Sequence, residues 1–307
     1  MFPRVLVVQM DYHKTLPTPK VTSQDWYYSR KLRTHLLGVY VANEDCLHCY
    51  FYDDTVAGAG PNEVISLLHS TLTKLTEQYG TFDQLIVWTD NAPSQFKECF
   101  FFFYLDHLVK NKYFLRIDLK FLVEGHSYSI CDRRFGSIQQ FFDTHEKVKV
   151  PQEWATLLKN SDLKNIKVHW ITSEVIMDYK SFLKMHYVSR NVDTEGNKFE
   201  VKKIAWINYG YGEVADERGN LKLVRHDGAF VRFKVDAMEK PTSVSFSKKK
   251  QGVQLKPDML SPVNLDKRLA PLKVKQDCEK LAQKYLSEAA KRFYAAMSCS
   301  DEDATDD

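Results

Sequence analysis

Apolar and polar positions alternate along the chain in a pattern that predicts an α/β protein. Short apolar runs bounded by turn residues are typical of buried strands, and apolar residues at helical spacing are typical of amphipathic helices. In the first 150 residues this pattern predicts strands at 4–11, 32–41, 47–52, 84–90 and 115–123. It predicts helices at 61–80, 95–110 and 132–146.

The order of these elements, three strands and then alternating helices and strands, predicts how they pair. Sequential strands with short links favour antiparallel pairing. Strands separated by helices favour parallel, right-handed crossovers onto the same sheet. The expected architecture is a mixed five-stranded sheet with helices on both faces, which is the RNase H-like fold. In that fold the first and fourth strands lie side by side.

The character of the sequence changes after residue 150. We expect residues 1–150 to form the RNase H-like core, followed by a β-rich C-terminal appendage and a C-terminal helix. The expected segments are a β-rich region at 151–240, a linker at 241–273, an amphipathic helix at 274–297 and an acidic, disordered tail at 298–307.

Composition places the chain among intracellular globular proteins. Of its 307 residues, 44% are hydrophobic and 27% are charged, both ordinary fractions. No apolar run approaches the roughly 18 residues of a membrane span, and no signal peptide is evident at the start. The six scattered cysteines fit reduced thiols. The net charge of +3 alone does not indicate nucleic acid; Lys248–Lys250 is a candidate phosphate contact or nuclear import signal, or simply a solvated linker.

Two predicted strands end on a carboxylate, at Asp11 and Asp90. If these strands are neighbours, the two carboxylates lie together at the sheet edge where α/β proteins bind ligands. Adjacent carboxylates repel unless a cation lies between them, and Mg²⁺ prefers such oxygen ligands. Asp132, at the start of the helix after the last strand, is our third ligand, with Asp143 in reserve. Two Mg²⁺ or Mn²⁺ ions held this way would cleave a phosphodiester.

Each of these aspartates also has a local explanation. Aspartate is common at strand ends and as a helix N-cap. Only the combination of all three, in this order of elements, indicates a site.

Several neighbouring residues are candidates for supporting roles. His126 could orient water or phosphate, or it could be a turn histidine bonded to the backbone. Gln95 and Lys97, at a predicted helix start, could hold phosphate. Arg133 and Arg134 beside aromatic residues suit a DNA surface. Capping and surface solvation are the alternative roles for Gln95 and Lys97, and about half of the aromatic and basic residues must simply belong to the core.

The segments Asp90-Asn91-x-x-x-Gln95-x-Lys97 and Gly125-His126-Ser127-x-x-x-x-Asp132 resemble the paired motifs of an uncharacterised family of eukaryotic transposase-derived proteins with an RNase H-like core. The resemblance covers about residues 5–150 and includes the opening block after Asp11. It implies metal-dependent DNA cleavage and strand transfer, with Asp11, Asp90 and Asp132 in the metal-binding places. It also implies a nuclear protein that binds double-stranded DNA, can assemble as a homo-oligomer and has no small-molecule substrate.

The chain departs from that family at Gln139, where many members have a Glu seven residues after the helix aspartate. A Gln has no negative charge, although its carbonyl oxygen can still accept. Most transposases also carry a separate DNA-binding domain, which we expect this chain to lack. The alternative function is therefore a catalytically decayed, domesticated module that binds DNA or protein. A nuclease acting on RNA is a third hypothesis, which differs only in substrate.

Cys46 and Cys49 form a C-x-x-C, which is half of a common type of zinc site. No second C-x-x-C or His pair follows at zinc-site spacing. The two cysteines also fall in a predicted strand, which points them to opposite faces. The sequence therefore argues against a zinc site built on this pair.

Overall fold

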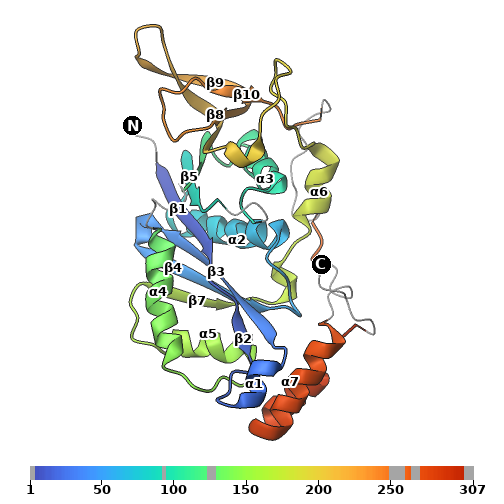
Figure 1. Cartoon of the computed structure of the whole chain (residues 1–307). Coiled ribbons are helices and arrows are strands. Elements are labelled where there is room, and N and C mark those ends of the chain that lie inside the picture. Colours follow the sequence, from blue (N-terminus) through green and yellow to red (C-terminus); the bar gives the residue numbers. More distant parts are fainter. Residues whose placement is uncertain (1–3, 92–94, 123–128, 249–259, 264–269, 301–307) are drawn as a thin grey trace.

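We describe a computed structural model, which defines residues 4–91, 95–122, 129–248, 260–263 and 270–300. Within these residues the chain is a mixed α/β protein with ten strands and eight α-helices (Figure 1). The strands are β1 Val5–Tyr12, β2 Leu16–Thr18, β3 Leu32–Val41, β4 Cys46–Asp53, β5 Gln84–Thr89, β6 Arg116–Phe121, β7 Ile166–Trp170, β8 Trp206–Ala215, β9 Leu221–Arg232 and β10 Thr242–Val244.

The helices begin where the sequence offers caps or proline. Ser129 caps one helix by accepting from Asp132 N, and two others open on Pro61 and Pro151. The helices are α1 Gln24–Tyr28, α2 Pro61–Tyr79, α3 Cys99–Lys110, α4 Ile130–Asp143, α5 Pro151–Lys159, α6 Tyr179–His186, α7 Leu272–Tyr285 and α8 Glu288–Ala296. Three short 3₁₀ turns are η1 Ala42–Glu44, η2 Ser173–Val175 and η3 Val201–Lys203.

All ten strands join one sheet, in the order β10-β9-β8-β6-β5-β1-β3-β4-β7, with β2 paired to β3. At its centre, β1 pairs antiparallel with β3 and parallel with β5. The β1–β5 register sets Met10 opposite Thr89. Since both strands run the same way, Asp11, still within β1, and Asp90, directly after β5, lie at the same end of these two strands.

The sheet has more strands than the five predicted. The five expected strands are present in a mixed arrangement, but β7 pairs with β4 and β8 pairs with β6. The β-rich region therefore continues the same sheet. The chemical reason is a buried carboxylate on β6, Asp118, which accepts bonds from Arg116 at 2.6 Å and from Trp206 of β8 at 2.9 Å. Asn208 of β8 also donates to it.

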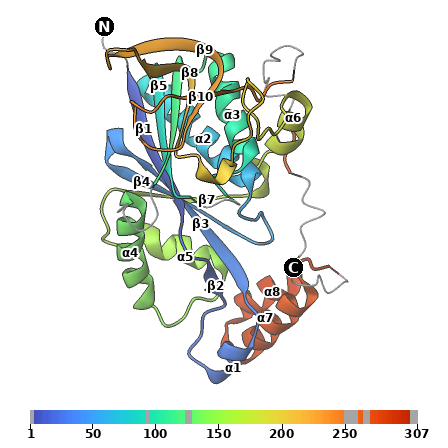
Figure 2. The ribbon, with the colours of Figure 1, turned by 45° about the horizontal axis from the view of Figure 1, so that its top comes forward.

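Helices cover both faces of the sheet (Figure 2). On one face, apolar residues of β1, β3, β5 and β6 pack against α2, α3 and α6. On the other face, α4 and α5 pack over β3 and β4, with Phe135, Phe142 and Trp154 buried there. Helices α7 and α8 form a third, smaller cluster around Leu32, at the far end of the molecule beside α1.

Three helical features differ from the sequence prediction. Helices α5 and α6 were not predicted, because each is short and its apolar residues lie within a segment read as strands and turns. The expected C-terminal helix at 274–297 is two helices, broken at Leu286 and Ser287. None of the helices in the described part of the chain has the length and apolar character needed to cross a membrane.

Candidate functional site

Asp11 and Asp90 lie together at the centre of the sheet, as the sequence predicts. Side chains alternate along a strand, so Gln9 and Asp11 of β1 face the α4 side, opposite the buried Val8 and Met10 that pack under α2 and α3. Asp90 follows β5 at the same edge, and its charge acts on Asp11. Both carboxylates are partly buried.

Asp132 reaches the same place from helix α4. Asp132 lies close enough to the Asp11 carboxyl to raise its pKa, by its negative charge and by side-chain hydrogen bonding. The start of α4 is fixed to β1 by two contacts: Ile130 N donates to Gln9 Oε1 at 2.9 Å, and Cys131 Sγ donates to Gln9 O at 3.5 Å. The structure therefore brings all three predicted aspartates together, from β1, β5 and α4.

The site is short of positive charge. Burial, and then the negative charges of Asp90 and Asp132, raise the pKa of Asp11 from its usual 3.8 to about 7. The hydrogen bond from Tyr12 N to Asp11 Oδ1 at 2.7 Å opposes that rise. Two carboxylates that cannot both stay ionised in one place share a proton or need a cation.

An all-oxygen donor set of this kind suits hard divalent cations such as Mg²⁺ and Mn²⁺. The three aspartates do not form a compact cage, however. Among the described residues, the group with ligand atoms all within 4.8 Å of one another is Glu44, Cys46 and His48 instead.

A groove of about 440 Å³ is lined by Asn91, the residue after Asp90, but by none of the three aspartates. Asn91 and Lys97 form one wall, and Lys202 and Lys203 of η3 form another. Lys97 is buried, and its Nζ donates to Asn91 Oδ1 at 2.7 Å and to Lys202 O at 2.6 Å. Lys97 therefore holds Asn91 against η3, and the lysines on η3 line the groove with their exposed side chains.

The other predicted site residues are distributed around the three aspartates. Arg133 is exposed beside Asp132 on α4, and Gln95 lies in the turn before α3. Arg134 pairs with Asp45 at 3.1 Å and donates to the backbone of Lys164, so it is held toward β4 and β7. His126 lies outside the described residues, as do Lys249 and Lys250.

Gln139 lies two turns further along α4 than Asp132. Its amide donates from Nε2 to Asp143 Oδ1 at 2.6 Å, and its Oε1 is buried with no partner among the described residues. Asp143, the reserve ligand, is thus hydrogen-bonded to Gln139 at the far end of the helix. Of the two candidate aspartates on α4, Asp132 is the one that contacts Asp11.

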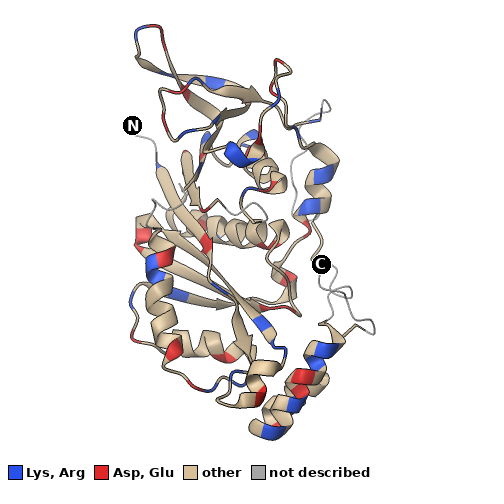
Figure 3. Cartoon of the chain, viewed as in Figure 1, with Lys and Arg blue, Asp and Glu red and all other residues tan. Residues whose placement is uncertain are grey.

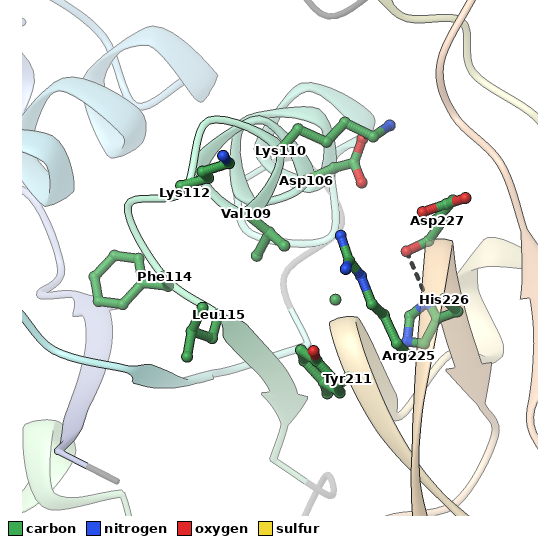
Figure 4. Close-up of a pocket in the computed structure, with 12 residues that line it drawn as sticks. Asp106, Val109, Lys110, Lys112, Phe114, Leu115, Tyr211, Arg225, His226 and Asp227 are labelled. Atoms are coloured by element: carbon green, nitrogen blue, oxygen red, sulfur yellow. Dashed lines mark hydrogen bonds and ion pairs between the residues drawn. The ribbon is translucent and has the colours of Figure 1, made fainter.

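A second pocket, of about 520 Å³, lies between the end of α3 and the β8–β9 hairpin (Figure 4). Its wall includes Lys110 and Lys112 on one side and Arg225 on the other. None of the three aspartates lines it. Other Lys and Arg residues of the described part of the chain lie on α6, on α7 and on the outer strands (Figure 3).

Gln9 is the functional residue that the sequence did not reveal. It is a polar side chain in an apolar strand, two residues before Asp11, and it is 8% exposed. Its amide oxygen positions the helix that carries Asp132. A buried polar residue on the same strand face as a candidate ligand is the signal that could have identified it.

Comparison with known proteins gives a family but no named relative. No curated protein matches the chain, and no solved structure matches it. A family model described as "Domain of unknown function (DUF7869)" matches residues 24–206, which include Asp90, Asp132 and the η3 lysines. Because that match spans more than half of the 307 residues, the chain belongs to the DUF7869 family.

Proposed function

We propose that this chain binds DNA and cleaves or transfers a phosphodiester strand at Asp11, Asp90 and Asp132, with Mg²⁺ or Mn²⁺ as cofactor. The observation that carries the proposal is the convergence of three aspartates from β1, β5 and α4, together with the raised pKa of Asp11. Perturbed carboxyl groups at the end of a central sheet are typical of functional sites.

We further propose that the fold is RNase H-like. The central strands run β4-β3-β1-β5-β6, with β3 antiparallel to β1 and with β5 and β6 parallel to it. A helix follows β6 and returns to β1. This order supports the proposal, since the fold places its carboxylates on the first strand, on the fourth strand and on that helix.

Each of these residues has its own role in the proposed reaction. Divalent cations, when bound, would activate water and stabilise charge on the phosphate. Asp11 would lose its proton when a bound cation offsets the repulsion from Asp90 and Asp132. Gln9 and Ser129 hold α4 so that Asp132 faces Asp11. Lys97 and Asn91 fix the turn that follows Asp90.

The surroundings of the aspartates suit a nucleic acid. Lys202 and Lys203 line the groove that Asn91, the residue after Asp90, also lines, and a backbone phosphate in this groove would meet positive charge. Trp88 lies two residues before Asp90, on the same face of β5, and Lys120 Nζ is 5.4 Å from its ring. A half-buried aromatic ring with neighbouring lysines can contact both base and phosphate. A DNA-processing role would place the protein in the nucleus, where a homo-oligomer could hold two DNA ends.

One observation favours the alternative, a module that binds DNA or protein without cleaving. The position seven residues after Asp132 is the uncharged Gln139, and its amide bonds to Asp143 instead of completing a carboxylate set. Loss of one negative charge would weaken cation binding.

Plasmid nicking tests the proposal directly. In Mn²⁺ we expect the wild-type protein to nick supercoiled DNA and Asp90→Asn to lose this activity. Asp143→Asn is the matched control, because Asp143 does not contact Asp11; it should nick as well as the wild type. Cleavage assays on DNA and on RNA of the same sequence show which of the two is the substrate. DNA binding without any nicking would favour the non-catalytic module, and nicking that survives Asp90→Asn would overturn the proposed site.

A further inference from the structure

A second cluster of metal-ligating side chains lies at the other end of the sheet, around the start of β4. Cys46 and His48 are two residues apart on this strand, so they face the same side. The preceding turn, η1, adds Glu44, and one ligand atom from each of the three lies within 4.8 Å of the others. Cys46 is 7% exposed and His48 is 4% exposed. The cluster is therefore buried and of mixed sulfur, nitrogen and oxygen chemistry.

The Glu44 carboxylate is already satisfied by hydrogen bonds. It accepts from Lys167 Nζ at 2.8 Å, from the Tyr79 hydroxyl at 2.8 Å and contacts His48 Nε2 at 3.2 Å. Burial opposes ionisation of Glu44, but these partners together lower its pKa to about 2. Glu44 is therefore a full negative charge inside this cluster.

Two of the remaining donor atoms lack partners among the described residues. Cys46 is a buried cysteine outside any disulfide. His48 Nδ1 and His169 Nε2 are both buried and unpartnered within the described part of the chain. The His169 ring, on β7, stacks 5.6 Å from that of His48. Buried polar atoms are normally hydrogen-bonded, so two unpartnered imidazole nitrogens beside a free thiol require an explanation.

We propose that Glu44, Cys46 and His48 bind a thiophilic divalent cation, Zn²⁺. Thiolate, imidazole and carboxylate are the three ligand types of protein zinc sites, and the sulfur selects zinc over Mg²⁺. His169, on the same side of the sheet, is the candidate for the fourth position. On binding, the Cys46 thiol loses its proton to solvent and the thiolate takes the metal.

The site differs from the one that the C-x-x-C pattern suggests. Cys49 faces the opposite side of β4 and packs in the cluster under α4 and α5. The partners of Cys46 are instead His48 and, from the preceding turn, Glu44. This agrees with the sequence argument against a zinc site built on Cys46 and Cys49. In the proposed site, a carboxylate and an imidazole take the place of the second thiol.

Lys167 competes with the cation for Glu44. Its side chain is 47% exposed, so its ammonium group can move into solvent when a cation takes its place. A cation can therefore bind Glu44 only after the ion pair between Lys167 and Glu44 is broken. Removal of this lysine should strengthen cation binding, whereas a purely structural hydrogen-bond network predicts no cation binding with or without it.

Titration with Co²⁺, a spectroscopic substitute for zinc, tests this site in the chelator-treated full chain. We expect a thiolate-to-cobalt charge-transfer band that saturates at one cobalt per chain and disappears when Zn²⁺ is added. Cys46→Ser should lose the band. Cys49→Ser, a buried cysteine on the opposite face, should keep it. Lys167→Met should bind Co²⁺ several-fold more tightly than the wild type.

Two outcomes would overturn the proposal. One is a wild-type chain without a thiolate band at saturating Co²⁺, and the other is a Cys46→Ser variant that keeps the band. If Cys46→Ser does not fold, as judged by circular dichroism, the wild-type band and the affinity of Lys167→Met decide the question. An unchanged affinity in Lys167→Met would then count against Glu44 as a ligand. The carboxylate site at Asp11 cannot produce a thiolate band, so the two sites are tested separately.

Discussion

At the scale of single residues, Asp11 is a carboxyl group in a position where a negative charge is costly. It is partly buried, and the charges of Asp90 and Asp132 act on it from two other elements. Proteins generally avoid this arrangement unless the charge has a use. The cost should be visible in the pH dependence of stability of the metal-free protein.

The raised pKa of Asp11 predicts that metal-free stability falls as pH rises. The folded state holds this proton up to about pH 7, whereas the unfolded chain releases it near 3.8. The stabilisation is therefore complete below about pH 4 and is lost as pH rises toward 7, at up to ~1.4 kcal/mol per pH unit before solvent screening reduces it. Asp11→Asn cannot ionise and should lack this component.

Chemical unfolding in a chelator at pH 5 and pH 8 measures this effect. We expect the difference in unfolding free energy between the two pH values to be larger for the wild type than for Asp11→Asn. At pH 8 the variant should be the more stable of the two proteins. Equal pH dependence in both proteins would show that the pKa of Asp11 is not raised in the folded protein.

At the scale of elements, the site depends on how α4 is attached to β1. Ile130 N, at the start of α4, donates to Gln9 Oε1 at 2.9 Å. Ser129 caps the helix by accepting from Asp132 N at 3.2 Å. Gly38 of β3 lies opposite Asp11, and a methyl group there would come within 2.7 Å of the Phe135 ring. These contacts fix the position of Asp132 without taking part in chemistry.

Gln9→Met should therefore weaken cation binding at the aspartates. The substitution keeps the side-chain length but removes the acceptor, which leaves Ile130 N unpaired at a cost of about 1–3 kcal/mol. Asp132 would then be held less firmly, and the affinity for Mn²⁺ should fall. Isothermal titration with Mn²⁺ measures this change.

Gln84→Met provides the control for Gln9→Met. Gln84 begins β5, at the opposite end from Asp90, and donates to Asp118 at 2.7 Å. Its loss should destabilise the protein to a similar degree but leave Mn²⁺ affinity unchanged. If both variants lose affinity equally, Gln9 contributes only to stability.

The local pattern of the sequence was sufficient to predict most central elements. Leu32–Val41 is predicted to the residue, and α2 ends one residue before the predicted Gly80. The meeting of Asp11, Asp90 and Asp132 followed from the order of elements. Gln9, the Glu44–Cys46–His48 cluster and the role of Lys97 could not be predicted in the same way, because each depends on contacts between elements that lie far apart in the sequence.

At the scale of the whole molecule, the sheet continues well beyond its central strands. The strands β8, β9 and β10 extend it past β6, and β7 extends it past β4 (Figure 1). The sequence predicted strands at 165–172 and 199–235 but not where they pair, and β10 falls in the predicted linker at 241–273. The attachment of β8 to β6 includes the buried network around Asp118, in which Arg232 of β9 is 0% exposed and donates to Asn208. Such polar contacts leave no periodic signal in the chain.

The extension of the sheet also forms the groove that Asn91 lines. Lys202 and Lys203 precede β8, and the pairing of β8 with β6 carries them to this groove. The candidate nucleic-acid surface is thus assembled from the central sheet and from the segment that joins it to β8.

The most direct test of a cation site at the three aspartates is thermal unfolding of the whole chain with and without Mn²⁺. At a Mn²⁺ concentration about 100 times the dissociation constant, binding should stabilise the wild type by ~2.7 kcal/mol, which corresponds to a rise of several degrees in the midpoint. Asp143→Asn should show the same rise, and Asp132→Asn should show little or none. A wild-type midpoint that ignores Mn²⁺, or a rise of equal size in Asp132→Asn, would contradict a cation site at Asp11, Asp90 and Asp132.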